Sequence, residues 1–249
     1  MWQYPLSLRW QAEGLPRGSP SLRVGKYRIR IVAYVDGFSV YYACYKGPTK
    51  VVHAHLKWLD YRAVFEAMFP HDDVTLVRIY TAIAPNPPGD DDQSTRHDTY
   101  RRALMTCPGV EVHVGRFQKA KREAMLAHPP PGIDPAQTVF IYQEKQSDVS
   151  LASHLVLDAI DDRFDRAVLF TNDSDFVTPI RLVRERTQRE VIVLSPDVTI
   201  NRELKKAASV GRIFDRGLLF KCQLPDPVID AEGREIRMPD RWRKQTEPE

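Results

Sequence analysis

Three short acidic motifs carry the side chains of this sequence that could do chemistry. Asp36 follows the apolar run IVAYV, Asp148 lies in EKQSDVS after VFIY, and Asp173 and Asp175 lie in TNDSDF after AVLF. Each apolar run is typical of a buried strand, and open α/β sheets place their sites where parallel strands end. The four carboxylates are therefore expected near one another at one edge of a sheet.

Repulsion among clustered carboxylates indicates that a cation binds between them. Like charges within a few ångströms raise one another's pKa, and a cation relieves the repulsion. Mg²⁺ and Mn²⁺ prefer oxygen ligands and keep several waters, which suits phosphate substrates. The cluster indicates metal-assisted phosphodiester chemistry.

Each acid also has a structural explanation when it is taken alone. Asp36, before Gly37, could cap a turn, and Asp148 could stabilise the first turn of a helix. Helical spacing, however, predicts that Asp148 shares the inward face of Leu155 and Ala159. At TNDSDF, an N-cap explains one aspartate but not both.

The composition predicts one α/β domain with extensions. The chain has 249 residues, 43% hydrophobic and 28% charged, with a formal charge of +3 and a pI near 8.7, which permits nucleic-acid binding without requiring it. No apolar stretch approaches the ~18 residues of a membrane span, and the N-terminus lacks a signal-like apolar core, so a cytoplasmic location is expected. The spacing of Cys44, Cys107 and Cys222 supports neither a disulfide framework nor a zinc site.

Hydrophobic periodicity predicts strands alternating with helices. Strands are expected at 28–35, 74–83, 110–117, 139–143, 167–170, 191–194 and 212–214. Helices are expected at 56–69, 95–105, 147–160 with Ser147 as its cap, 175–186 and 201–208. Such alternation predicts a mostly parallel sheet between helical layers.

The remaining segments predict the domain organisation. Residues 1–26 are expected to be a flexible lead-in, and 27–216 to form the domain. Within it, the Lys/Arg- and Pro-rich stretch 119–137 predicts a surface excursion that is too polar for the core. Residues 217–249 are expected to form a polar tail.

The three motifs together resemble the NYN domain family, the LabA-like branch of the PIN-like nuclease superfamily found in bacteria. VDGFSVYY, EKQSDVSLASHLVLDAI and TNDSDFVTPI fall in the family's order and spacing, and the resemblance covers roughly residues 28–215. It implies a Rossmann-like three-layer α/β sandwich with a mostly parallel central sheet. It also implies that the catalytic and metal-binding set is Asp36, Asp148, Asp173 and Asp175. Ser39 stands where the family usually has Asn, and Asn172 where many members have Gly.

The function that the resemblance implies is a metal-dependent ribonuclease. One or two Mg²⁺ or Mn²⁺ ions would activate water and stabilise charge on the scissile phosphate. Ser39 and Ser174 would position solvent or phosphate, Lys145 could contact a phosphate, and Tyr41 could stack on a base. A solvated lysine and a tyrosine packed in the core are the simpler explanations of the last two.

Other functions and partners stay open from the sequence. A fold that binds RNA without efficient chemistry is the main alternative, motivated by Ser39. A third is an NADH-dependent pyridine-ring hydroxylase resembling 6-hydroxy-3-succinoylpyridine hydroxylase, although no flavin or nicotinamide fingerprint is present. A homodimer is also open. Basic residues that could follow an RNA backbone, or form only a solvated face, are Arg96, Arg101, Arg102, Lys119, Lys121 and Arg122.

Overall fold

A six-stranded parallel sheet forms the centre of the protein. The computed structural model describes residues 28–46 and 53–243, so the predicted lead-in lies outside the described residues. The strand order is β3-β2-β1-β6-β7-β8, and every neighbouring pair is parallel. The strands are β1 (Arg30–Asp36), β2 (Asp73–Thr81), β3 (Val110–Val114), β6 (Arg166–Phe170), β7 (Glu190–Ser195) and β8 (Val210–Ile213). The predicted α/β fold class is confirmed.

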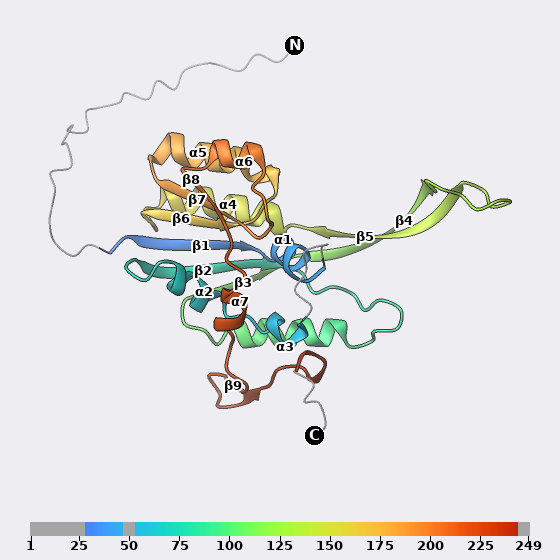
Figure 1. Cartoon of the computed structure of the whole chain (residues 1–249), viewed down its shortest axis with the longest axis horizontal. Helices are drawn as coiled ribbons and strands as arrows, with labels where there is room; N and C mark the ends of the chain where they lie inside the picture. The colour runs from blue at the N-terminus through green and yellow to red at the C-terminus, as the bar shows by residue number, and fades with distance from the viewer. Residues whose placement is uncertain (1–27, 47–52, 244–249) are drawn as a thin grey trace, which may run out of the picture.

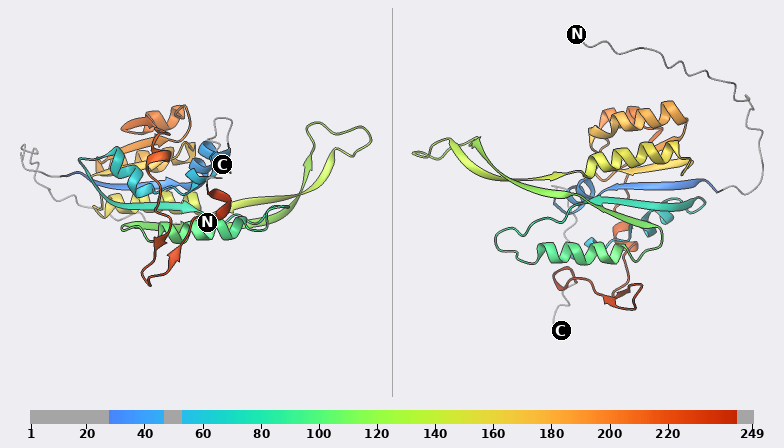
Figure 2. Two further views of the ribbon diagram at one scale, coloured as in Figure 1. Left: turned by 60° about the horizontal axis from the view of Figure 1, so that its bottom comes forward. Right: turned by 180° about the vertical axis from the view of Figure 1, so that it is seen from behind.

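Helices cover both faces of this sheet and make a three-layer sandwich (Figures 1 and 2). One layer contains α2 (Tyr61–Met68), α3 (Gln93–Leu104) and α7 (Leu218–Lys221), and the other contains α4 (Ser147–Ile160), α5 (Val177–Thr187) and α6 (Arg202–Ala207). Alternate residues of β1 enter separate cores, with Val35 in one and Tyr34 in the other. A strand that is buried on both faces needs a continuous apolar sequence, which is what IVAYV supplies.

The strand order determines where a site can form. From β1 the chain moves outward through β2 to β3, then returns to β6 on the other side of β1 and continues outward. The carboxyl ends of β1 and β6 therefore lie side by side where the direction of winding reverses. Doubly wound sheets bind their ligands at this switch point.

A long antiparallel ribbon extends from the sandwich (Figure 1). It consists of β4 (Arg116–Met125) and β5 (Ala136–Lys145), paired along all ten residues of each strand. The strand predicted at 139–143 therefore belongs to this ribbon, and its assignment to the central sheet is wrong. Short apolar alternation cannot reveal a strand's partner, and here the polar stretch 118–122 pairs with residues 139–143.

The segment after residue 217 packs on the core, which corrects the prediction of a polar tail for its described part. Leu219, Leu224 and Trp242 are buried against the layer that contains α2 and α3. The Trp58 carbonyl accepts a hydrogen bond from the Leu224 backbone N–H at 3.0 Å, and the Trp58 indole donates to the Pro225 carbonyl at 3.0 Å. Its two short strands are β9 (Val228–Ile229) and β10 (Glu235–Ile236). The apolar residues lack a regular period, so periodicity cannot reveal this packing.

Several helix boundaries differ locally from the prediction. The helix expected at 56–69 is divided into a 3₁₀ turn at Ala54–Lys57 and α2, because the Asp60 side chain caps α2 at the Ala63 backbone N–H. α4 begins after Gln146, whose φ is 88°, so Ser147 is its first residue and not its cap. No described helix is long and apolar enough to cross a membrane.

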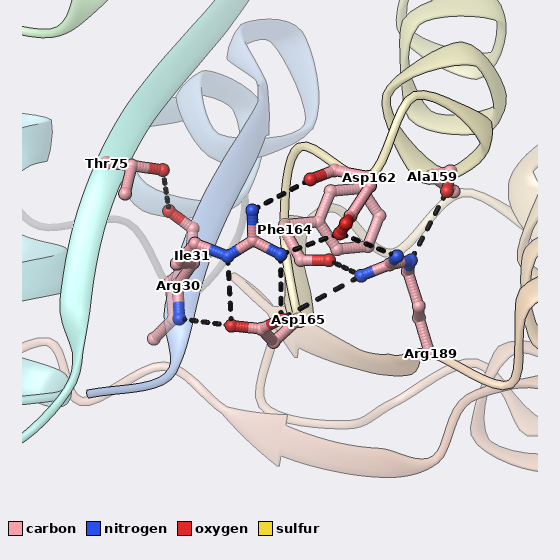
Figure 3. Close-up of polar contacts among 8 residues, drawn as sticks. All are labelled: Arg30, Ile31, Thr75, Ala159, Asp162, Phe164, Asp165 and Arg189. Carbon is pink, nitrogen blue, oxygen red and sulfur yellow. Dashed lines mark hydrogen bonds and ion pairs between the residues drawn. The ribbon is translucent and has the colours of Figure 1, made fainter. Parts of the chain in front are cut away.

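The amino-terminal edge of the sheet is held by paired charges (Figure 3). Arg30 contacts Asp162 at 2.7 Å and Asp165 at 2.9 Å, and Arg189 contacts Asp162 at 2.8 Å. The Asp165 carboxylate also accepts the Arg30 backbone N–H at 2.9 Å. Arginine thus neutralises the acids at this edge and ties β1 to the turn before β6.

Candidate functional site

Asp36 lies at the end of β1, at the switch point. Its side chain is 7% exposed; Oδ1 accepts the Ser39 backbone N–H at 3.0 Å, and Oδ2 accepts the Thr171 hydroxyl at 2.9 Å. Asp36 is therefore also the N-cap of α1 (Gly37–Tyr41). A Cβ on Gly37 would lie 2.8 Å from the Tyr80 carbonyl oxygen, so this turn against β2 needs glycine.

Thr171 joins the first and third acidic motifs and was not singled out by the sequence reasoning. It is fully buried after β6, and its hydroxyl accepts the Asp173 backbone N–H at 3.1 Å while donating to Asp36. One side chain thus fixes Asp36 and the backbone of Asp173. Its position directly after the apolar run AVLF is the signal that could have identified it.

The third motif forms a short 3₁₀ helix, Ser174–Phe176, ahead of α5. Asp173 caps this turn, because its Oδ1 accepts the Asp175 backbone N–H at 3.0 Å. Ser174 and Asp175 are exposed. Capping thus accounts for Asp173, whereas the Asp175 carboxylate has no such role.

Asp148 is exposed in the first turn of α4, which corrects its predicted place on the inward face. The buried positions of α4 include Ser147, Leu151 and Leu155, one residue out of phase with Asp148 at the start of the helix. Glu144 lies close by, and its Oε1 accepts both the Ser147 hydroxyl at 2.6 Å and the Ser147 backbone N–H at 3.2 Å. Sequence reasoning missed Glu144, although it stands within the quoted EKQSD motif.

The carboxylates disfavour one another's charge. Burial raises the pKa of Asp36, and the neighbouring Asp173 raises it further, against hydrogen bonds from Ser39 and Thr171 that lower it. The pKa of Asp148 rises to about 6, first because surrounding protein displaces water, then because of Asp36, Glu144, Asp173 and Asp175. A cation at this edge would relieve repulsion that the folded chain itself leaves in place.

Ser39 and Asn172, the two departures from the family pattern, interact directly. The Ser39 hydroxyl accepts the Asn172 backbone N–H at 3.2 Å. The Asn172 side chain donates to Asp197 at 2.8 Å and accepts the Asn201 backbone N–H at 2.7 Å. Together they connect the loop after β6 to α1 and to the N-terminus of α6.

Lys145 and Tyr41 lie beside the acidic edge in different surroundings. Lys145 is exposed at the end of β5 and pairs in register with Arg116. Tyr41 is half-buried in the wall of a cavity of about 460 Å³. The aromatic residues of this wall are Phe38, Tyr41, Tyr42, Tyr45, Tyr61, Tyr100, Phe117, Tyr142 and Trp242, and Lys57, His97 and Arg101 add polar groups.

The donor chemistry of the acidic edge fits a hard divalent cation. Asp148 and Asp175 expose their carboxylates, and the Asp36 oxygens accept hydrogen bonds from Ser39 and Thr171. A carboxylate has about four lone-pair positions, so Asp36 keeps acceptor capacity for a cation. Within residues 28–46 and 53–243, no three His, Cys, Asp or Glu side chains converge closely enough to form a complete ligand set. An ion here would therefore keep several waters, as Mg²⁺ commonly does.

Comparisons with known proteins place the chain in a family. It is 28% identical over 248 residues to 6-hydroxy-3-succinoylpyridine 3-monooxygenase HspA from Pseudomonas putida, covering 88% of this chain and 77% of that protein. A crystal structure of a protein of unknown function from Vibrio parahaemolyticus aligns with a TM-score of 0.46 at 20% identity, covering 76% of this chain and 94% of that one. The NYN domain matches residues 30–214, most of the sequence. The chain therefore belongs to the NYN domain family.

Proposed function

We propose that this protein is a divalent-metal-dependent ribonuclease whose site is the acidic edge at the switch point. The observation that carries the proposal is a group of carboxylates that raise one another's pKa, with Asp36 and Asp148 shifted upward. Membership of the NYN domain family supports it, because NYN and other PIN-like domains are generally nucleases and the family indicates an RNA-related function. The opposite edge differs, since Arg30 and Arg189 neutralise its acids.

The residues of the edge would divide the work of holding a cation and an RNA phosphate. Mg²⁺ or Mn²⁺ would supply an activated water and stabilise charge on the phosphate. Asp36 and Asp173 would be direct ligands, held in position by Thr171, whereas Asp148 and Asp175 would bind directly or through water. Ser174 lies exposed between the last two motif acids and would position solvent or phosphate.

The direct test is cleavage of a panel of labelled single-stranded and hairpin RNAs. We expect cutting with Mn²⁺ or Mg²⁺, none with EDTA, and a loss of roughly 100-fold or more in Asp173→Asn, because a metal ligand contributes at least as much as the groups that orient it. Asp161→Asn is the matched control, because Asp161 is an exposed aspartate at the far end of α4. It should cut like the wild type.

Other results of this test identify the alternatives. RNA binding without cutting by the wild type would contradict the nuclease and support an RNA-binding module, for which Ser39 in place of Asn is the motivating departure. Equal cutting by wild type and Asp173→Asn would show that the activity comes from elsewhere. If the wild type fails both to bind and to cut every RNA of the panel, that result would overturn an RNA function.

A second candidate function is oxidation of a small aromatic ring. Two observations favour it: the name of the Pseudomonas putida relative, and the aromatic cavity of about 460 Å³ beside Asp36. Its polar groups Lys57 and Arg101 could hold an acidic substituent. Bound flavin or iron in the absorbance spectrum, with NADH consumption on 6-hydroxy-3-succinoylpyridine, would support this function. A colourless protein that consumes no NADH would exclude it.

A further inference from the structure

One face of the β4–β5 ribbon interleaves lysines with aromatic rings. Side chains opposite each other in an antiparallel pair lie on the same face. The register pairs Phe117 with Glu144, Lys119 with Tyr142, and Lys121 with Phe140. We call this set the arm face: Phe117, Lys119, Lys121, Phe140, Tyr142 and Glu144.

Two aromatic rings of the arm face, those of Phe140 and Tyr142, are open to solvent. Phe140 is 56% exposed and Tyr142 is 47% exposed. Lys119 Nζ lies 4.1 Å from the centroid of the Phe140 ring and 5.6 Å from that of Tyr142, and Lys121 Nζ lies 5.5 Å from Phe140. The ribbon thus presents flat apolar surfaces with positive charge beside them, an arrangement that its own packing does not require.

The cations of the ribbon lack acidic partners. No ion pair within residues 28–46 and 53–243 involves Arg116, Lys119, Lys121, Arg122 or Lys145. The basic residues of α3 differ, since Arg96 contacts Asp90 at 2.5 Å and Arg101 contacts Asp98 at 2.7 Å. Of the two basic groups that stand out in the sequence, the ribbon's is the one whose cations make no ion pair among the described residues, whereas Asp90 and Asp98 pair with the arginines of α3.

The arm face is continuous with the acidic edge. The Phe117 ring packs edge-on against Phe38, two residues after Asp36, with centroids 5.8 Å apart. Phe117 and Tyr142 line the cavity beside α1, and the base of the ribbon lies next to α1 in Figure 1. At that base, Glu144 Oε1 accepts the hydroxyl of Ser147, the residue before Asp148, at 2.6 Å. Phe140 stands four residues from Glu144, roughly 13 Å along a strand.

We infer that the arm face binds single-stranded RNA and leads it to the acidic edge. Bases would stack on Phe140 and Tyr142, and Lys119 and Lys121 would contact phosphates, as sequence-tolerant single-strand binders do. A duplex keeps its bases stacked on one another, so it cannot use these rings. The identity of the ligand as RNA rests on the proposed function, whereas the stacking geometry rests on the ribbon alone.

The test is binding, measured in EDTA so that it does not depend on cleavage. Fluorescence anisotropy of an unstructured labelled RNA would compare the wild type with the double variant Phe140→Ala, Lys119→Ala. The matched control is Phe220→Ala, Lys221→Ala on α7, because Phe220 is also 56% exposed and Lys221 is exposed beside it. Circular dichroism would establish that both variants are folded.

We expect the arm variant to bind single-stranded RNA about 10-fold or more weakly, since one stacked base and one phosphate contact are lost. The slope of log K against log salt should become shallower by roughly 0.7, for one cation removed. The control should bind like the wild type, and weak binding of a duplex should change little in either variant.

Equal binding by the wild type and the arm variant would overturn the inference, as would an equal loss for duplex RNA. A changed molecular mass by light scattering with unchanged RNA affinity would also overturn it, because the arm face would then contact a second copy of the chain. Arm-dependent binding without cleavage would contradict only the proposed nuclease. Equal RNA cleavage by the wild type and the arm variant would contradict only this inference.

Discussion

Thr171 shows why residue-level prediction reached part of the site and missed the rest. Sequence order places Asp36 and Asp173 at the ends of strands, and the structure brings their motifs together through the Thr171 hydroxyl. A threonine gives no chemical signal of its own, so only its contacts reveal it. Asp148 was misplaced because Ser147, one residue earlier, takes the buried position at the start of α4 and leaves Asp148 exposed. The catalytic roles of these residues stay predictions.

The raised pKa of Asp148 predicts that removing its charge stabilises the metal-free protein. This carboxyl titrates at about 6 when folded against an ordinary 3.8, so between these values the folded chain binds more protons than the unfolded chain. The free energy of unfolding therefore falls as pH rises through this window, and the penalty persists above it. Asp148→Asn should raise the urea midpoint in EDTA at pH 7.5, by less than about 1 kcal/mol because the side chain is exposed.

The gain from Asp148→Asn should shrink at pH 5, where much of the wild-type carboxyl is already protonated. Asp161→Asn, on the same helix, should show no comparable gain. A variant less stable than the wild type at pH 7.5 in EDTA would contradict the repulsion that we assign to this edge.

At the scale of elements, buried strands were easier to predict than the ribbon. IVAYV and AVLF are continuous apolar runs because helices cover both faces of the central sheet. β5 alternates between half-buried and exposed residues, as an edge strand of that sheet could also do. Its partner β4 is polar, and nothing local in the sequence states that 116–125 pairs with 136–145. Topology of this kind comes from long-range pairing, which periodicity does not encode.

Gly115 sets the junction at which the ribbon leaves the sheet. A Cβ there would lie 2.2 Å from Glu144 Oε1, 2.7 Å from the Lys145 carbonyl oxygen and 2.8 Å from Ser147 Oγ. Gly115→Ala should therefore displace the start of α4, destabilise the fold by roughly 1–3 kcal/mol and impair any activity of the acidic edge. Chemical denaturation and the RNA cleavage assay measure the two effects.

Gly211→Ala is the matched control for that substitution. Its Cβ would meet the end of the flexible Ile200 side chain at 3.0 Å in the edge strand β8, so a small shift can accommodate it. Equal stability of Gly115→Ala and the wild type would show that the junction is less tightly packed than the distances indicate.

At the scale of the whole molecule, the chain's last described segment completes the core. Trp242 is 6% exposed, and its ring lies 6.5 Å from that of Trp58 and 5.9 Å from that of Tyr100, between centroids. By composition, residues 217–243 are predicted to be polar, because charged residues separate the few apolar side chains that are buried. Anchoring of this kind depends on a few single contacts, and an average over a window conceals them.

Trp242→Ala should accordingly destabilise the whole domain by about 3 kcal/mol, the lower end of the range for a buried large aromatic side chain. Trp242→Phe keeps most of the apolar contact and should cost less. Thermal unfolding measures both. A Trp242→Ala protein as stable as the wild type would mean that the segment adheres to a core that is complete without it.

The contrast between the two edges of the sheet has a consequence for the order in which ligands arrive. Acids at the amino edge are neutralised by Arg30 and Arg189, whereas those at the carboxyl edge are left to repel one another. Uncompensated negative charge therefore lies at the carboxyl end of the strands and not at their amino end. Under the proposed function, a phosphate approaching the bare acidic edge is repelled, and the cation must load first. The ribbon would hold the incoming RNA away from the repelling carboxylates of the acidic edge until the cation has bound.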